Sequence, residues 1–297
     1  VLNRIVRWCD ATPDSKEAIE MEADPRHASL ILQHLGLDKQ KTKGLTSTGE
    51  KHKQTEVGPL LPESEQTSYR SCCMRVAFLA SDRWELKFAS KECARHMSSP
   101  SLLGMKQLKH IGRFLKLHPR VVQRLERQPP QKRLVTFSDS DHAGCTLTRK
   151  STSCSCTFYG SHCIQFAATT QIPISLSSGE SEYNSLVRGA SVGIGMKSLA
   201  ADFKTPLSLV LKADSTAAKG IASRRGAGNV KHIDIGTLWL QQHVTNRMLT
   251  VEKEDGKTNP ADMGTKYLKY ADLKKCMLKC GLHFRSGQSK LALKVGQ

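Results

Sequence analysis

Apolar and polar positions alternate most regularly in the second half of the chain. Residues 133–139, 151–159 and 162–168 have the pattern of strands, and Gly160-Ser161 supplies a turn between the last two. Residues 177–203 keep apolar positions at helical spacing and predict a long helix. Beyond it, strands are predicted over residues 207–213 and 248–252, and helices over residues 215–223, 233–244 and 260–280.

The first half has a more helical pattern with one polar interruption. A helix is predicted over residues 25–37. Residues 38–66 are polar and rich in Lys, Thr, Gly and Glu, which is typical of a loop or linker. Helical spacing returns over residues 69–127, and Pro129-Pro130 then interrupts any regular element.

This order of elements predicts the fold class and the domains. Three strands, a helix and then alternating strands and helices are typical of a mixed α/β sheet flanked by helices. A length of 297 residues indicates two domains. We expect a mostly helical first domain over residues 1–130, with its linker at about 38–66, a second domain over 131–272, and a basic tail over 273–297.

The net charge points to a polyanionic partner. The chain has 45 Lys and Arg against 27 Asp and Glu, a net charge of +18 that favours nucleic acid binding. Basic residues recur at three- or four-residue spacing between residues 106 and 120 and would line one helix face, which can follow a phosphate backbone. The alternative is an ordinary solvated helix face. The predicted basic stripe is Lys106, Lys109, Arg113 and Lys116.

Several classes of protein are disfavoured. The ten cysteines do not form the paired Cys/His spacing of a zinc site. No stretch of eighteen mostly apolar residues occurs, so we expect no membrane span. The sequence starts at Val1 without a visible signal, which we interpret as a fragment of a longer intracellular protein, cytoplasmic or nuclear.

Four acidic residues lie where strands end or helices begin. Asp139 ends a strand on the apolar face of Val135 and Phe137, a costly place for a carboxylate unless it is paired or metal-bound. Asp214 follows another apolar strand, and Asp262 follows Asn259-Pro260. Each also has a structural interpretation: a turn for Asp139, a helix N-cap for Asp214, and a first-turn charge for Asp262.

The start of the long helix offers two glutamates. Ser177 and Glu180 have the spacing of a capping box, which assigns Glu180 to the helix end. Glu182 instead shares its face with Leu186 and Gly189, an inward face. The predicted metal site is therefore Asp139, Glu182, Asp214 and Asp262, with two Mg²⁺ (or Mn²⁺) ions, because these ions prefer oxygen ligands and cleave phosphodiesters in pairs.

Six short motifs then resemble one family in the correct order. They are similar to the ribonuclease H domain of Copia-type (Pseudoviridae-like) retrotransposon Pol polyproteins. The motifs are Phe137–Gly144, Arg149-Lys150-Ser151-Thr152-Ser153, Leu176–Tyr183 with its glutamate before Tyr183, Ala213-Asp214-Ser215, Lys231-His232-Ile233-Asp234 and Ala261–Lys266.

The resemblance extends upstream into the reverse transcriptase of the same polyprotein. Asp24–Ala28, Ser68–Ser71 and Leu108–Lys116 are similar to the part that follows its polymerase site, so residues 1–130 would be a thumb- or connection-like remnant. The polymerase needs paired aspartates, and no Asp-Asp dipeptide occurs, so no polymerase activity is expected. The integrase of such polyproteins carries a His/Cys zinc module, which is also missing.

The resemblance implies a ribonuclease H-like fold and hydrolysis of the RNA strand of RNA–DNA hybrids. Asp139, Glu182, Asp214 and Asp262 would be the catalytic metal ligands. Arg149, Lys150, Lys231 and His232 would join the basic stripe in binding nucleic acid. The partners would be the hybrid and the remainder of the polyprotein. The alternatives are an inactive nucleic-acid-binding remnant and a decayed fragment without a partner.

The motifs also depart from the family at positions outside the four carboxylates. His142 stands where an aromatic residue is usual, Cys145 replaces an Asp, Cys154 a Gly and Phe166 a Trp. These changes bear on folding and binding rather than on metal ligation.

Overall fold

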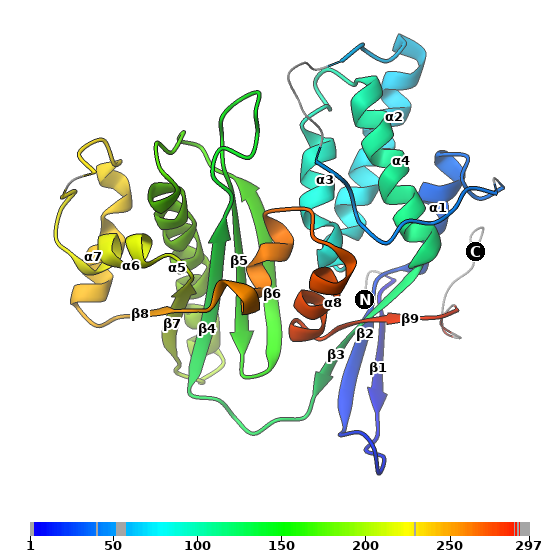
Figure 1. The fold of residues 1–297 in the computed structure, drawn as a ribbon. Helices are drawn as coiled ribbons and strands as arrows, with labels where there is room; N and C mark the ends of the chain where they lie inside the picture. Colours follow the sequence, from blue (N-terminus) through cyan, green and yellow to red (C-terminus); the bar gives the residue numbers. More distant parts are fainter. Residues whose placement is uncertain are drawn as a thin grey trace. The chain divides into compact units, whose positions relative to one another are not determined.

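A computed structural model describes residues 3–39, 41–51, 58–228, 230–287, 289 and 291. The chain divides into two compact units (Figure 1). Val1–Arg127 and Tyr267–Gln297 form the first unit, and Gln128–Lys266 forms the second. Within the described residues, every helix is too short or too polar to cross a bilayer.

The second unit is built on a five-stranded mixed sheet. Its strands are β4 (Arg133–Ser140), β5 (Thr152–Tyr159), β6 (His162–Thr170), β7 (Ser208–Ala213) and β8 (Thr250–Lys253). Their order is β6-β5-β4-β7-β8, with antiparallel pairing among the first three and parallel pairing of β4 with β7 and of β7 with β8. This order confirms the expected α/β class with a ribonuclease H-like fold.

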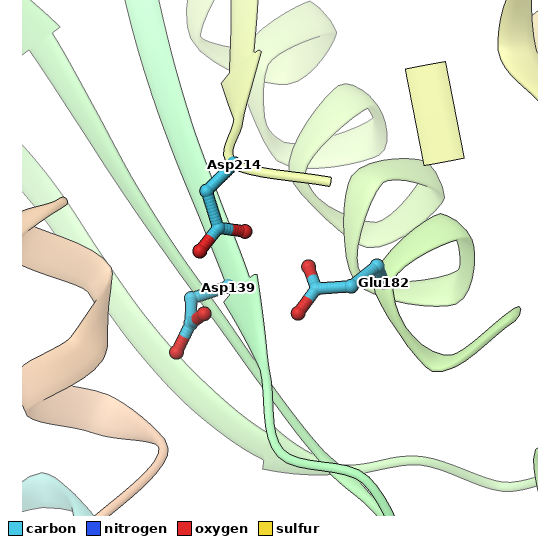
Figure 2. A group of neighbouring side chains, drawn as sticks. All are labelled: Asp139, Glu182 and Asp214. Atoms are coloured by element: carbon cyan, nitrogen blue, oxygen red, sulfur yellow. The ribbon is translucent and has the colours of Figure 1, made fainter. Parts of the chain in front are cut away.

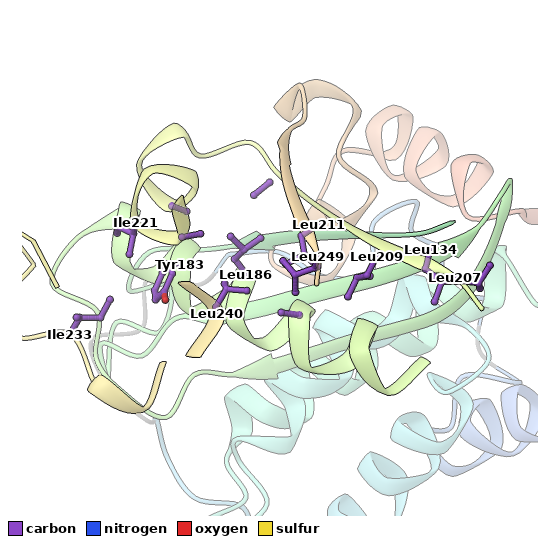
Figure 3. Packing of buried hydrophobic residues seen from close by; sticks show 14 residues of the cluster. Leu134, Tyr183, Leu186, Leu207, Leu209, Leu211, Ile221, Ile233, Leu240 and Leu249 are labelled. Carbon is purple, nitrogen blue, oxygen red and sulfur yellow. The ribbon is translucent and has the colours of Figure 1, made fainter. Parts of the chain in front are cut away.

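Helix α5 (Ser178–Asp202) packs across β4, β5 and β7. The core between them contains Leu134, Leu209 and Leu211 from the strands and Leu186 from the helix (Figure 3). Helices α6 (Thr216–Ser223) and α7 (Trp239–Thr245) complete the same apolar cluster.

Two glycines allow α5 to lie close to the sheet. A Cβ at Gly193 would fall 2.8 Å from Leu209 Cδ1 and 2.9 Å from Thr136 Oγ1, closer than real Cβ contacts. A Cβ at Gly189 would meet Thr136 and Ser138 at 3.4 and 3.5 Å. The residues beneath Gly189 are small and polar, and one of them, Thr136, is hydrogen-bonded through Oγ1 to Thr157 Oγ1 at 2.9 Å.

The predicted final helix over residues 260–280 is wrong. The chain forms a short 3₁₀ helix, η4 (Pro260–Gly264), and then α8 (Tyr270–Lys279). Thr265 is the C-cap of η4, with φ of −116°, and its hydroxyl donates to Asp139 Oδ2. The predicted helix over residues 233–244 is likewise divided, because Asp234 caps a separate turn, η2 (Ile235–Thr237), before α7.

The first unit contains a sheet that the sequence pattern did not reveal. The expectation of a mostly helical segment is wrong in this respect, because a four-stranded sheet in the order β1-β2-β3-β9 accompanies the helices. Its strands are β1 (Ile5–Cys9), β2 (Ala18–Glu22), β3 (Arg120–Glu126) and β9 (Leu282–Arg285), and its helices are α1 (Pro25–His34), α2 (Glu63–Leu79), α3 (Lys87–Ala94), α4 (Leu102–Leu117) and α8.

Charged residues explain why the hydrophobic pattern did not predict these strands. Glu20 and Glu22 on β2 are nearly buried, because Arg7 on β1 and Arg120 and Arg124 on β3 cover them with ion pairs. Arg120 and Arg124 on β3 are four residues apart, the same spacing as in the preceding helix, so the sequence pattern predicted that the helix continued. The predicted tail from residue 273 is also incorrect, since β9 pairs with β3 inside the described residues.

The predicted linker at residues 38–66 is shorter in the structure. Helix α2 already begins at Glu63. Leu45 donates its backbone N–H to Arg113 O at 3.1 Å, which holds this part of the segment against α4. Residues 52–57 lie outside the described part of the chain.

Replacing Leu186 by Ala tests the packing of α5. Leu186 is fully buried, and we expect a loss of about 2–5 kcal/mol in the free energy of unfolding of the second unit. Leu199→Ala is the matched control on the same helix, because Leu199 is 47% exposed; it should cost about 0.5 kcal/mol or less.

Urea denaturation followed by Trp239 fluorescence reports this unit, with Trp8 and Trp84 replaced by Phe in every variant. Equal destabilisation by the two leucine changes would contradict the described packing.

Candidate functional site

Three carboxylates meet at one edge of the second unit's sheet. Asp139 lies at the end of β4, Asp214 follows β7, and Glu182 points from α5 toward both (Figure 2). Each offers an oxygen within 4.8 Å of the others. Because β4 and β7 are parallel neighbours, their carboxyl ends reach the same edge of the sheet, where ligand sites of α/β proteins gather. We call these three residues the carboxylate cluster.

Asp139 is the most buried member, at 3% exposure. Burial raises the pKa of its carboxyl well above the usual range, and the negative charges of Asp262 and Glu182 raise it further. Thr265 Oγ1 donates a short hydrogen bond to Asp139 Oδ2. Sequence reasoning missed Thr265, although it stands in the same motif as Asp262.

Glu182 has one satisfied and one unsatisfied oxygen. The backbone N–H of Ser140 donates to Oε1 at 3.3 Å, while Oε2 is buried and has no hydrogen-bond partner among the described residues. Burial, and then the charge of Asp214, raises the Glu182 pKa from 4.5 to about 7. A buried oxygen without a donor is costly, and a bound cation would satisfy it.

Asp214 is not the N-cap of α6, although its position in the sequence allowed that role. The N-cap of α6 is Ser215, whose Oγ accepts from the backbone N–H of Ala218 at 3.1 Å. The capping interpretation of Asp214 is therefore wrong. Burial, followed by the charge of Asp262, raises the pKa of the Asp214 carboxyl.

Asp262 lies beside the cluster on η4. Asn259 caps this turn by accepting from the N–H of Ala261 at 3.1 Å, with Pro260 at the first position, as the sequence predicted. Asn259 Nδ2 also donates to Ser138 O at 2.9 Å, which ties η4 to β4. Asp262 Oδ2 forms an ion pair with Lys266 Nζ at 3.0 Å.

Glu180 faces away from the cluster. Its backbone N–H donates to Ser177 Oγ at 3.2 Å, and its Oε2 accepts from the N–H of Leu176 at 2.8 Å. The same carboxylate lies 2.9 Å from His232 Nε2. The geometry thus separates the two glutamates as the helix pattern predicted, with Glu180 at the cap and Glu182 at the cluster.

The donor set fits a hard divalent cation. It consists of carboxylate oxygens, two of the three carboxylates retain partial exposure, and one buried oxygen lacks a donor. Mg²⁺ and Mn²⁺ prefer such oxygen ligands, whereas zinc sites usually include His or Cys. The cluster is therefore compatible with divalent metal binding.

The predicted basic stripe on α4 divides into two pairs. Lys106 and Lys109 are exposed. Arg113 Nε donates to Lys43 O at 2.8 Å and Lys116 Nζ donates to Leu37 O at 2.9 Å. The second pair thus holds a neighbouring segment of its own unit, which reduces its availability to a phosphate.

The basic residues predicted in the second unit also differ in their surroundings. Arg149 is exposed and has a left-handed backbone with φ of 58°, and Lys150 is partly exposed beside it. Lys231 is exposed. His232 is half-exposed, but its Nε2 is already engaged with Glu180.

The departures from the motif pattern are accommodated inside the unit. Cys145, Cys154 and Phe166 are buried, and His142 is exposed. Gly264 lies against two of these side chains, since a Cβ there would fall 2.3 Å from Cys154 Sγ and 3.2 Å from Phe166 Cε1. Only a glycine fits this approach of η4 to β5 and β6.

No family model matches the chain. It is 32% identical over 130 residues to an uncharacterized mitochondrial protein of Arabidopsis thaliana, a match that covers 43% of this chain. The chain spans about half of that relative, 52% of its length.

Two solved ribonuclease H1 structures are also similar. One was isolated from compost by a metagenomic approach (10% identity, 46% of this chain, 94% of that chain, TM-score 0.33). The other is from the halophilic archaeon Halobacterium salinarum (14% identity, 45% of this chain, 94% of that chain, TM-score 0.29). The fold assignment rests on the strand order described above.

The motif order and the sheet topology agree with each other. The motifs resemble those of a ribonuclease H domain, and the second unit has the mixed sheet expected of that fold.

The raised pKa of Glu182 predicts a pH-dependent stability. Because the folded-state pKa lies above 4.5, the contribution of Glu182 to stability is greatest below that pH and is lost as pH rises through about 7. In chelator, wild type should lose about 2 kcal/mol more of its free energy of unfolding between pH 5 and pH 8 than Glu182→Gln loses.

Urea denaturation followed by Trp239 fluorescence, as above, measures this loss at each pH. Glu252→Gln is the control, because Glu252 is an exposed strand residue. Parallel pH profiles for wild type and Glu182→Gln would contradict the described burial.

Proposed function

We propose that the second unit is a metal-dependent endonuclease that hydrolyses the RNA strand of RNA–DNA hybrids within a Copia-type Pol polyprotein. The observation that carries the proposal is the carboxylate cluster, which gathers like charges at the end of two parallel strands and leaves a buried Glu182 oxygen without a donor. Such an arrangement is unfavourable without a cation and suits a divalent metal.

Asp139, Glu182 and Asp214 would hold the metal, with Asp262 as the fourth carboxylate. Two Mg²⁺ or Mn²⁺ ions, when bound, supply the charge that stabilises the attacking and leaving oxygens of a phosphodiester. The chain's own contribution is to fix the ligands. Thr265 fixes the Asp139 carboxylate, and the Ser140 N–H orients Glu182.

Nucleic acid binding would use the exposed basic residues. Lys106, Lys109, Arg149, Lys150 and Lys231 are exposed or partly exposed, although Lys106 Nζ lies 4.0 Å from Glu50 Oε1. Arg113, Lys116 and His232 donate to or contact buried or carbonyl groups of their own units. An excess of 18 positive charges supports affinity for a hybrid without sequence preference. No polymerase activity is expected, because the sequence has no Asp-Asp dipeptide.

A catalytically inactive nucleic-acid-binding remnant is the second candidate. It is favoured by the four departures from the family motifs, three of which (Cys145, Cys154 and Phe166) change buried side chains of the second unit. The remnant would bind a hybrid through the same basic residues without cleaving it.

Asp214→Asn separates the two candidates. The substitution keeps the shape of the side chain and removes one ligand charge, so hybrid cleavage with Mg²⁺ should fall by about two orders of magnitude or more, while hybrid binding persists. Thermal stability in chelator should stay similar or rise, because a like charge is removed from the cluster.

Asp202→Asn is the matched control at the far end of α5, where the residue is exposed. It should leave cleavage of a labelled hybrid unchanged. Wild-type protein that binds the hybrid but never cleaves it with Mg²⁺ or Mn²⁺ would overturn the nuclease proposal in favour of the remnant.

The exposed half of the basic stripe predicts a change in salt dependence. Replacing both Lys106 and Lys109 by Gln should lower the log–log salt slope of hybrid binding by about 1.8, if each contacts one phosphate at about 0.9 per contact. Fluorescence anisotropy at several salt concentrations measures the slope.

Lys274→Gln with Lys275→Gln removes the same charge from exposed positions of α8 and serves as the control. Equal slopes for the two double variants would exclude α4 from the binding surface.

A further inference from the structure

Lys266 brings a positive charge to the rim of the carboxylate cluster. Its Nζ lies 3.0 Å from Asp262 Oδ2, and its side chain remains 43% exposed. The charge of Lys266 lowers the pKa of Asp139, Glu182 and Asp214 against the opposing effect of burial. One ammonium group therefore acts on all members of the cluster.

The position of Lys266 follows from its neighbour. Thr265 donates from its hydroxyl to Asp139 and also contacts Asp262 O at 3.3 Å, so the backbone next to Lys266 is fixed against the cluster. Lys212, the basic residue on β7, is instead paired with Glu254 at 3.0 Å. Lys253 also lowers the pKa of Asp214, whereas the charge of Lys266 acts on Asp139, Glu182 and Asp214 and forms an ion pair with Asp262.

An ammonium group and a divalent cation cannot both be close to the same carboxylates without repulsion. The ammonium group stabilises the cluster when no metal is bound, and its charge opposes an entering ion. Because its tip is partly exposed and its stem is flexible, Lys266 can withdraw toward solvent without disturbing η4.

We propose, building on the proposed nuclease function, that Lys266 is an exchangeable counter-ion. It occupies the rim of the carboxylate cluster in the absence of metal and weakens the affinity of the cluster for Mg²⁺. The metal concentration that the site requires is then set by Lys266 as well as by the carboxylates.

Calorimetric titration of the full chain with Mg²⁺ tests this role. Lys266→Met should tighten Mg²⁺ binding about tenfold, which corresponds to about 1.4 kcal/mol. In chelator, the second unit of Lys266→Met should melt at a lower temperature than that of wild type. Addition of Mg²⁺ should abolish this difference in melting temperature. Lys266→Arg keeps the charge and should bind Mg²⁺ like wild type.

Lys204→Met removes the same charge just beyond the far end of α5, about 30 Å along the helix from Glu182. It should leave Mg²⁺ affinity unchanged, because exposed charges at such a distance are screened.

Each outcome decides the proposal. Equal Mg²⁺ affinity for wild type and Lys266→Met would overturn the counter-ion role and leave the nuclease proposal intact. Absence of Mg²⁺ binding by wild type, as by Asp139→Asn, would overturn both. Should Lys266→Met be unfolded in chelator, refolding on Mg²⁺ addition supports the role, and failure to refold contradicts it.

Discussion

The second unit depends on holding like charges together against their repulsion. Asp139, Glu182 and Asp214 each raise the cost of ionising a neighbour, and burial adds to that cost. The energy that opposes the repulsion comes from the apolar packing of α5 on the sheet and from hydrogen bonds that fix individual ligands, such as that from Thr265. The site is therefore a region of electrostatic repulsion, which a bound cation would reduce.

Small residues on the sheet-facing side of α5 make this arrangement possible. Gly189 and Gly193 let the helix axis approach β4, which brings Glu182 within reach of two strand ends. At the other side of the cluster, Gly264 allows η4 to lie against β5 and β6 and to present Asp262. Close approach at both sides brings acidic side chains from four separate elements to one edge.

Sequence patterns anticipated the second unit better than the first. The strand ends that carry Asp139 and Asp214 follow uninterrupted apolar runs, and the capping spacing of Ser177 and Glu180 assigned Glu182 to the inner face. The contribution of Thr265 could not be predicted, because it depends on the break between η4 and α8, which tertiary contacts determine.

In the first unit, the spacing of charged residues led to a wrong prediction of helix where the chain forms strands. Strand β3 carries arginines four apart, and β2 buries glutamates under arginines, so neither has the apolar alternation of a strand. Buried ion pairs of this kind are invisible to a hydrophobic pattern. Hydrogen bonds of Arg113 to Lys43 O and of Lys116 to Leu37 O are tertiary contacts too, and they engage half of the predicted basic stripe on α4.

The return of the chain to the first unit makes the second unit an insertion. Strand β3 receives one neighbour, β2, from the residues before the insertion and the other, β9, from the residues after it. During synthesis, the four-stranded sheet remains incomplete until the entire second unit has been made. A single proteolytic cut cannot release either unit intact. A truncation after Lys266 removes β9 and leaves one edge of β3 without its neighbouring strand.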